Sequence, residues 1–518
     1  MNFVSRNTIS LLCIFFVLNL GNGYATTLDT LRHFDVQPLG SYSALWGYTA
    51  PDGREYAITG VNGSSSVPYP GGTSIIDITD APSVQQVAFI GGPNSQWREM
   101  KTYKHYAYVV TEAGGGVQII NLSQLPDTAW LVKSFNYISG AKNIQRVHSV
   151  SLHDGFLYLN GCANWSPGGT VIFDVRNDPE NPVYVGEYQP AYLHDIYVLR
   201  DTIYGSAING QGLYIADARN KASISTIGLI SYSGSGTHNA WVTKDRQYVI
   251  STDEIGTTAK TLKFWNIGNL PTIPSSPTST YTPAPGQIEH NVTVRGDYAY
   301  VAWYSAGVQV VNVTNPASPT NAGGYDTSPS NTGYNGAWAV YPYFPSGKII
   351  ASDIQNGLWV FSFSDLAPRL SVNLLQPSDA QFLTVPGTQV FRWTRTANPN
   401  KDPHYYALSI TGPGIDTVVN VSDSTYSFGG FIDGQTYQWT VTTLDEFNVT
   451  ASVDTFAFTY DPQPPAIPAL SSPVDGTQDQ PLSVTLSWSA AVGASLYRLQ
   501  LATDSTFAVF LVDDSSSV

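Results

Sequence analysis

One apolar phrase recurs seven times along the first two-thirds of this 518-residue chain. One copy reads Gly-Val-Gln-Ile-Ile-Asn-Leu, and successive copies begin 43 to 53 residues apart, at residues 73, 116, 169, 212, 262, 307 and 357. Each copy predicts a buried strand that ends at a polar turn residue, usually Asp or Asn, whose side chain binds nearby backbone. A period of about 40 to 50 residues is typical of a four-stranded propeller blade. The repeat therefore predicts an all-β fold, a seven-bladed β-propeller over residues 26–368.

The strands around each phrase predict how the ring closes. Two strands precede each phrase and a fourth follows it, but the seventh phrase runs into Leu366-Ala-Pro-Arg-Leu without a fourth strand. Residues 34–42 match the fourth-strand pattern and precede the first blade. We expect this segment to pair with residues 357–363, because a ring closed in this way has no open sheet edge at its seam.

These phrases, with their spacing and order, resemble the LVIVD repeat. The arrangement from about residue 28 to residue 363 is similar to the choice-of-anchor B family of bacterial surface proteins. The resemblance implies an extracellular propeller. It implies no particular activity, so function has to be argued from the site.

A different pattern begins after the propeller. Residues 369–461 contain alternating strands around Trp393 and Trp439, which is typical of a β-sandwich, and this segment resembles a fibronectin type III module. Residues 462–518 open with a proline-rich joint and resemble the first half of a second module. We expect this second module to be truncated, with an anchor beyond it, and both modules to act as a spacer.

The N-terminal segment and the composition limit where the chain works and what it binds. Residues 1–25 predict a secretory signal peptide, because the apolar run over residues 9–20 is too short to span a bilayer and is followed by small residues. We expect an extracellular or cell-surface protein without a transmembrane segment in its mature form. Cys162 is then its only cysteine, so no internal disulfide is available. The net charge of −15 and the lack of clustered basic residues exclude nucleic acid as a partner.

Four of the eight histidines share one position in consecutive blades. When the first strand of each blade is aligned, the matched residues are Trp46, Glu99, His148, His194, His238, His290 and Trp338. The first strand of a blade lines the central channel, so these side chains are expected to gather at one mouth. Imidazole and carboxylate groups suit zinc, iron, copper or manganese, and the sequence nominates the four histidines and Glu99 as metal ligands.

The ends of the second strands add further polar and aromatic residues to the same mouth. The residues expected to bind a ligand there, with the two tryptophans of the first strands, are Glu112, Asp253, Glu254, Trp303, Tyr304, Trp46 and Trp338. Asp195, Asn239 and Asn291 follow three of the histidines, and we expect their side chains to hydrogen-bond the rings and fix the tautomers.

Three functions remain open at this point. The mouth binds a glycan, a peptide or a small polar molecule of the cell surface or its surroundings, with or without a metal ion. Alternatively, a metal held by the histidines activates water, and the protein is an extracellular hydrolase. A third reading is a structural adhesion protein in which the propeller is a rigid spacer. The sequence alone does not decide whether the chain is an enzyme.

Overall fold

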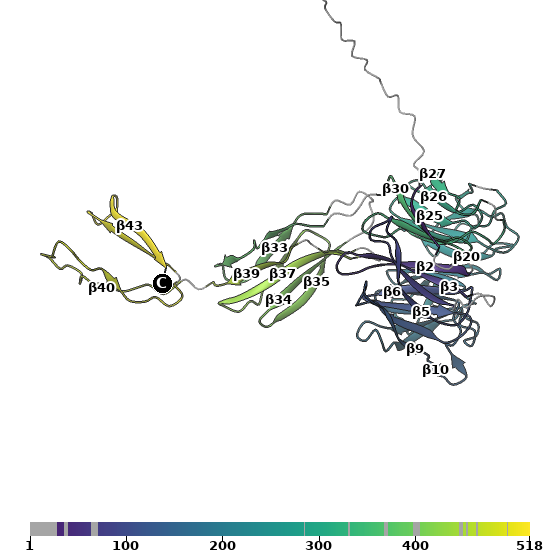
Figure 1. Ribbon diagram of the computed structural model, residues 1–518, viewed down its shortest axis with the longest axis horizontal. Coiled ribbons are helices and arrows are strands. Elements are labelled where there is room, and N and C mark those ends of the chain that lie inside the picture. Colours follow the sequence, from purple (N-terminus) through teal and green to yellow (C-terminus); the bar gives the residue numbers. More distant parts are fainter. Residues whose placement is uncertain are drawn as a thin grey trace, which may run out of the picture. The chain divides into compact units, whose positions relative to one another are not determined.

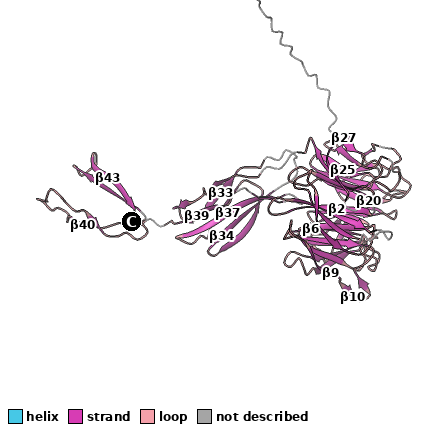
Figure 2. Ribbon diagram, viewed as in Figure 1, coloured by secondary structure: helices cyan, strands magenta, loops and turns pink. Residues whose placement is uncertain are grey.

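The protein is built from β-strands. The computed structural model describes residues 28–35, 40–63, 71–283, 285–329, 332–366, 371–396, 405–444, 449–451, 454–462, 465–494 and 496–517. Figure 2 shows strands joined by loops and turns throughout this part of the chain. Over the same residues, no helix has the length and apolar character needed to cross a membrane. The signal peptide predicted over residues 1–25 lies outside the described residues.

The chain divides into two compact units, the first formed by Met1–Ala50 and Arg54–Ala367 and the second by Pro51–Gly53 and Pro368–Val518. Within its described residues, the first unit contains seven four-stranded antiparallel sheets (Figure 1). We name each sheet after its first strand. The first four contain β2 (Ser41–Thr49), β3 (Glu55–Asn62), β4 (Gly72–Asp77) and β5 (Gln85–Gly91); β6 (Arg98–Tyr103), β7 (Tyr106–Thr111), β8 (Val117–Asn121) and β9 (Trp130–Phe135); β12 (Ser149–His153), β13 (Phe156–Asn160), β14 (Thr170–Asp174) and β15 (Val183–Tyr188); β16 (Asp195–Leu199), β17 (Thr202–Ala207), β18 (Gly212–Asp217) and β19 (Ser225–Ile230).

The other three sheets follow in chain order, except that the last takes one strand from the N-terminal end. They contain β20 (Thr237–Val242), β21 (Tyr248–Asp253), β22 (Leu262–Asn266) and β23 (Ser279–Tyr281); β24 (Asn291–Arg295), β25 (Tyr298–Ala302), β26 (Val308–Asn312) and β27 (Thr320–Tyr325); β28 (Ala337–Tyr341), β29 (Ile349–Asp353), β30 (Gly357–Phe363) and β1 (Leu28–Phe34). The seven apolar phrases of the sequence form the third strands of these sheets.

Burial follows the order of strands within a sheet. All six residues of β7 and all five residues of β8 are buried, whereas β9, the outer strand of the same sheet, is mostly exposed or half-buried. Tyr108, Ile119 and Phe173 belong to one core cluster between the β6 and β12 sheets. Cys162 is buried in the same cluster. Packing of the faces of neighbouring sheets therefore supplies the hydrophobic core of this unit.

The first strands meet one another in cyclic order. Contacts join β2 to β6, β6 to β12, β12 to β16, β16 to β20, β20 to β24, β24 to β28 and β28 to β2. This succession brings the starting ends of all seven strands around one centre. This arrangement places the candidate site at that centre.

The seam is closed by the N-terminal segment, but by different residues from those predicted. β1 pairs antiparallel with β30, with Leu28 opposite Phe363 and Phe34 opposite Leu358. The prediction that residues 34–42 form this strand is wrong, because Ser41 and Tyr42 begin β2 and pair with β3. An outer strand is largely exposed, so its sequence carries little hydrophobic pattern to locate it. Leu28 is the buried residue of β1 and packs in the core cluster that contains Phe361 and Phe363.

The second unit contains sheets of a different kind. One has the order β31 (Leu374–Gln376), β33 (Gln389–Trp393) and β36 (Thr425–Phe428); another has the order β32 (Gln381–Leu383), β39 (Phe456–Tyr460), β37 (Gln435–Leu444), β34 (Tyr405–Gly412) and β35 (Ile415–Val421), with β38 (Val449–Ala451) beside β37. Trp393 and Trp439 are 2% and 1% exposed and share one core cluster. Two separate hairpins follow, β40 (Leu470–Ser472) with β41 (Ser487–Trp488) and β42 (Leu496–Ala502) with β43 (Phe510–Ser517).

Candidate functional site

Four histidines from four consecutive sheets form an arc at the starting ends of the first strands. His148, His194 and His290 each directly precede a first strand, and His238 is the second residue of β20. Ring centroids are 3.8 Å apart for His148 and His194, 4.4 Å for His194 and His238, and 4.1 Å for His238 and His290. The structure thus brings together the four rings that the shared sequence position had aligned.

Two of these rings have their Nδ1 atoms fixed by an oxygen from a neighbouring sheet or the turn that follows its second strand. Nδ1 of His290 lies 2.5 Å from the backbone oxygen of Trp338, which can only accept, so this nitrogen carries the proton. Nδ1 of His148 lies 2.6 Å from Oε1 of Glu112. A proton on Nδ1 leaves the Nε2 lone pair free to bind a cation, as in metal sites whose histidines donate to a carbonyl or a carboxylate.

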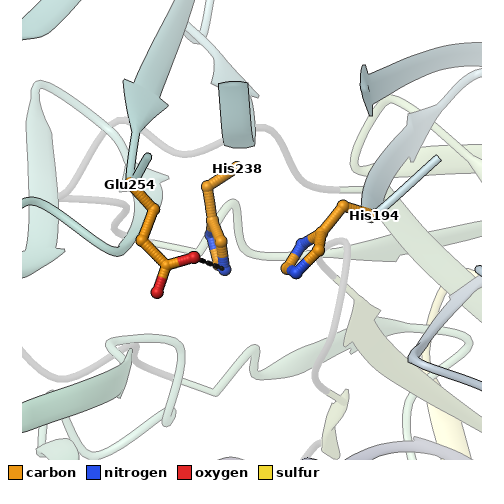
Figure 3. A group of neighbouring side chains, drawn as sticks. All are labelled: His194, His238 and Glu254. Atoms are coloured by element: carbon orange, nitrogen blue, oxygen red, sulfur yellow. Dashed lines mark ion pairs between the residues drawn. The ribbon is translucent and has the colours of Figure 1, made fainter. Parts of the chain in front are cut away.

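Glu254 completes the arc from the end of the neighbouring strand. Its Oε2 lies 3.6 Å from Nε2 of His238, and its Oε1 lies 3.9 Å from Nε2 of His290. In Figure 3 the carboxylate of Glu254 points at the ring of His238, and the ring of His194 faces them from the other side. One potential ligand atom from each of these three residues lies within 4.8 Å of the other two.

Tyr304 orients this carboxylate. Its hydroxyl donates to Oε1 of Glu254 at 2.6 Å, and its ring lies 4.6 Å from that of His290. Tyr304 has a φ of 24°, a backbone conformation that is costly for a residue with a side chain. The hydrogen bond leaves Oε2 of Glu254 directed toward the histidines.

The central rings are neutral near pH 7. Burial lowers the pKa of His194 and His238 well below the usual value, and the neighbouring histidines lower it further. Burial also lowers the pKa of His290, although the negative charge of Glu254 opposes this effect. Nδ1 of His194 and Nδ1 of His238 are buried and have no hydrogen-bond partner of ordinary geometry among the described residues, although the backbone of the next histidine in the arc partly opposes the lowering of each pKa. Neutral imidazoles with available nitrogen atoms are the form that binds metal ions.

The arc surrounds a small cavity. Its lining residues are Ala44, Trp97, Arg98, Glu99, His148, Ser149, His194, Asp195, His238, Glu254, His290, Asn291 and Trp338. Its volume is about 40 Å³. One water needs at least about 10 to 15 Å³ by the same measure, so the cavity has room for an ion and a few waters, but not for a sugar ring or a peptide.

Asn239 ties together three of the sheets that carry the histidines. Its Nδ2 donates to Oδ2 of Asp195 at 2.5 Å, and its Oδ1 accepts from the backbone N–H of Val292 at 3.0 Å. Asn291 donates from Nδ2 to the carbonyl of Trp338 at 3.2 Å. The prediction that Asp195, Asn239 and Asn291 bond the rings is therefore wrong. Their side chains instead bond each other and neighbouring backbone atoms.

Several residues predicted to bind a ligand do not line the cavity. Asp253 is fully buried and forms an ion pair at 2.7 Å with Lys263, while Trp303 is buried and donates from Nε1 to the carbonyl of Gln287. Trp46 lies beside Tyr341, with Nζ of Lys101 over its ring. Trp46 is therefore not the residue of β2 that lines the cavity; Ala44 is.

Glu99 lines the cavity, but its nearest charged partner is not a histidine. Its Oε1 lies 2.5 Å from Nζ of Lys101, two residues along the same strand. Asp195 belongs to the same wall, and loss of solvent together with the negative charge of Glu99 raises its pKa to about 7. Trp97 and Arg98 also line the cavity and were not predicted. The sequence signal that could have identified these two lining residues is their position directly before Glu99.

Comparison with known proteins identifies the repeat but no activity. The model of the LVIVD repeat matches residues 288–327. No curated protein matches the chain significantly. With the repeated four-stranded sheets, the LVIVD match supports a repeat β-propeller in the first unit.

Some solved structures resemble the chain weakly. A putative 6-phosphogluconolactonase from Bacteroides uniformis is 12% identical over 53% of this chain and 82% of its own, with a TM-score of 0.42. The C-terminal WD40 domain of Sif2 is 13% identical over 64% of this chain and 85% of its own, with a TM-score of 0.41. A protein from Lactobacillus plantarum is 12% identical over 61% of this chain and 97% of its own, with a TM-score of 0.45.

Proposed function

We propose that this chain is an exported, seven-bladed propeller that binds a transition-metal ion in its central cavity through His194, His238 and Glu254. The observation that carries the proposal is the convergence of two neutral imidazoles and one carboxylate within 4.8 Å. His290 is the fourth candidate ligand, because its Nε2 faces the same carboxylate.

The separations between these atoms are close to those of a loaded site. Ligand bonds of about 2.0 to 2.2 Å at tetrahedral angles put neighbouring ligand atoms roughly 3.4 Å apart. His238 and Glu254 are at 3.6 Å, so this pair needs almost no movement. The ligand nitrogen of His194 lies within 4.8 Å of the other two ligand atoms, so it has to approach by at most about 1.4 Å.

The choice of ion follows from the ligand atoms. Two imidazoles and one carboxylate suit zinc, iron, manganese or copper, whereas magnesium and calcium prefer oxygen ligands. The cavity volume favours an ion over the glycan or peptide considered from the sequence alone, because organic ligands occupy pockets of roughly 300 Å³ or more.

The test is the metal content of the purified protein after incubation with zinc, manganese, copper or iron salts and gel filtration. We expect about one equivalent of one metal in the wild type, and loss of that metal in a His194→Ala/His238→Ala double variant. The matched control is His105→Ala, since His105 lies in a turn outside the cavity. If the wild type retains none of the four metals, the metal proposal fails. Retention of the full equivalent by the double variant would show that the ion lies elsewhere.

Metal-dependent hydrolysis is the second candidate function. It is favoured by the composition of the ligand set, since two histidines and one carboxylate leave a coordination position for water and recur in catalytic zinc sites. A panel of ester, phosphoester and glycoside substrates tests it. Activity that disappears with a chelator and returns with the metal supports the hydrolase, whereas a metal-loaded protein inert on all three classes refutes it for these bonds.

The rest of the chain fits a surface protein. We propose that residues 1–25 direct export and that residues 369–461 and 462–518 are fibronectin type III-like modules that act as a spacer. The burial of Trp393 and Trp439 in one core supports the sandwich. The third candidate from the sequence, a purely structural adhesion protein, is the reading that remains if neither a metal nor a substrate is found.

A further inference from the structure

A second and larger depression lies beside the connection between the β6 and β12 sheets. Its volume is about 460 Å³, within the range of sites for organic ligands. It is lined by Ala113, Gly114, Asn136, Ile138, Asn143, Gln145, Arg146 and Asn164. We call this depression the amide bowl, because four of its eight lining residues are asparagine or glutamine.

The bowl exists because one connection between sheets is elaborated. The chain between β9 and β12 contains a hairpin of β10 (Ile138–Ser139) and β11 (Lys142–Asn143). The other described connections between successive sheets contain no strand. An insertion confined to one connection on a repeated scaffold is where binding residues are commonly placed.

The lining is held in place by its own hydrogen bonds. Oδ1 of Asn143 accepts from Nδ2 of Asn164 at 3.0 Å and from the backbone N–H of Gln145 at 3.3 Å. Nε of Arg146 donates to the carbonyl of Glu112 at 2.8 Å. These bonds partly preorganise the bowl.

We propose that the amide bowl binds a neutral carbohydrate. An amide side chain offers two donors and one acceptor oxygen, and each sugar hydroxyl both donates and accepts, so adjacent hydroxyls can be bridged by one amide. Ile138 is 66% exposed and supplies an apolar surface for the C–H face of a sugar ring. The lining has no carboxylate and only one cation, Arg146, while the whole chain carries a net charge of −15. This balance favours a neutral ligand over an acidic one.

This inference goes beyond the proposed metal site and does not rest on it. The residues that line the bowl and the residues that line the central cavity do not overlap. Glu112 is the link between them, since its carbonyl accepts from Arg146 and its carboxylate binds His148. Metal retention and carbohydrate binding can therefore fail separately.

The test is affinity electrophoresis of the whole chain through gels that contain one soluble polysaccharide each. The neutral probes are starch, β-glucan, mannan, xylan and galactan, and the acidic probes are alginate and polygalacturonate. We expect retardation by at least one neutral probe. The variant Gln145→Ala removes an exposed amide whose side chain forms no hydrogen bond with the described residues of the hairpin. It should weaken the retardation about three- to tenfold, the loss typical of one or two hydrogen bonds.

The matched control is Asn269→Ala, which removes an exposed amide outside the bowl. It should bind the polysaccharide as the wild type does. An Asn143→Ala/Gln145→Ala variant should bind the polysaccharide still more weakly. If the wild type holds metal, the variant should retain the same metal content, which shows that it is folded. If the wild type holds no metal, the circular dichroism spectrum of the variant is the folding control. No retardation by any neutral probe, retardation by acidic probes alone, or equal retardation of wild type and both bowl variants would each overturn the proposal.

Discussion

Asn239 gives the sharpest test of how the candidate site is held together. Its side chain joins Asp195 in the β16 sheet to Val292 in the β24 sheet from its own place in the β20 sheet. Replacing Asn239 by alanine removes both bonds and leaves two groups without their partner. The backbone bond from the N–H of Asn239 to Oγ1 of Thr252 at 3.2 Å stays available to the variant.

The magnitude follows from where each orphaned group lies. Val292 is fully buried, so loss of the partner of its N–H costs up to about 3 kcal/mol. Asp195 lines the cavity, where water can replace the lost donor, and its other oxygen still accepts from the N–H of Ile196 at 2.8 Å; this loss costs about 1 kcal/mol. We therefore expect Asn239→Ala to lower the free energy of unfolding by about 2 to 4 kcal/mol.

Urea unfolding followed by fluorescence and circular dichroism measures this change, and Asn269→Ala is the control, with an expected change within about 0.5 kcal/mol. A double-mutant cycle with Asp195→Ala isolates the bond between the two side chains, for which we expect a coupling energy of about 0.5 to 3 kcal/mol. If Asn239→Ala is as stable as the control, the three sheets are held by packing alone and the reasoning is refuted.

Three further predictions concern the closure, the second unit and the single buried thiol. Leu28→Ala should destabilise the first unit by about 2 kcal/mol or more, because Leu28 is 4% exposed within the core beside β30, whereas Leu31→Ala in the same strand should be nearly neutral in urea unfolding. Residues 371–461 expressed alone should unfold cooperatively, and a fluorescence spectrum like that of unfolded tryptophan before heating would contradict this. Cys162 should resist iodoacetamide at pH 8 in the native protein and react in urea, because burial raises the pKa of its thiol to about 12; rapid native labelling would contradict its burial.

The sequence predicts the repeated elements of this fold because they are buried. The third strands are short apolar runs that recur every 43 to 53 residues, and their burial makes the hydrophobic pattern strong. The outer strands are half exposed, and this is why the strand that closes the seam was placed at residues 34–42 instead of Leu28–Phe34. This strand has one buried residue, Leu28, and six that are exposed or half-buried, and so weak a hydrophobic pattern does not fix the boundaries of a strand.

The four histidines were predictable for a related reason. Each lies ten residues before a tyrosine of the second strand, namely Tyr158, Tyr204, Tyr248 or Tyr300. In a cyclic arrangement of sheets, such a shared position becomes a ring of side chains in space. The alignment fails at β2, where Ala44 lines the cavity and Trp46 does not. A bulge alone does not explain this failure, because β20 and β28 have register shifts beside His238 and Trp338, and both residues still line the cavity.

The sequence contains a signal that distinguishes Glu254 from Glu99 as a neighbour of the histidines. The alignment of matched positions across the sheets does not reveal this signal. His238 lies at the start of β20, and Glu254 directly follows β21, its antiparallel partner; Thr237 pairs with Asp253. A residue that starts one strand and a residue that ends the next are therefore neighbours within one hairpin. Glu99 has no such neighbour among the histidines and instead has Lys101 on the same face of its own strand, where an opposite charge at 2.5 Å holds it. If the strand pairing within each hairpin is considered before the sheets are aligned with one another, Glu254 is the carboxylate expected beside His238.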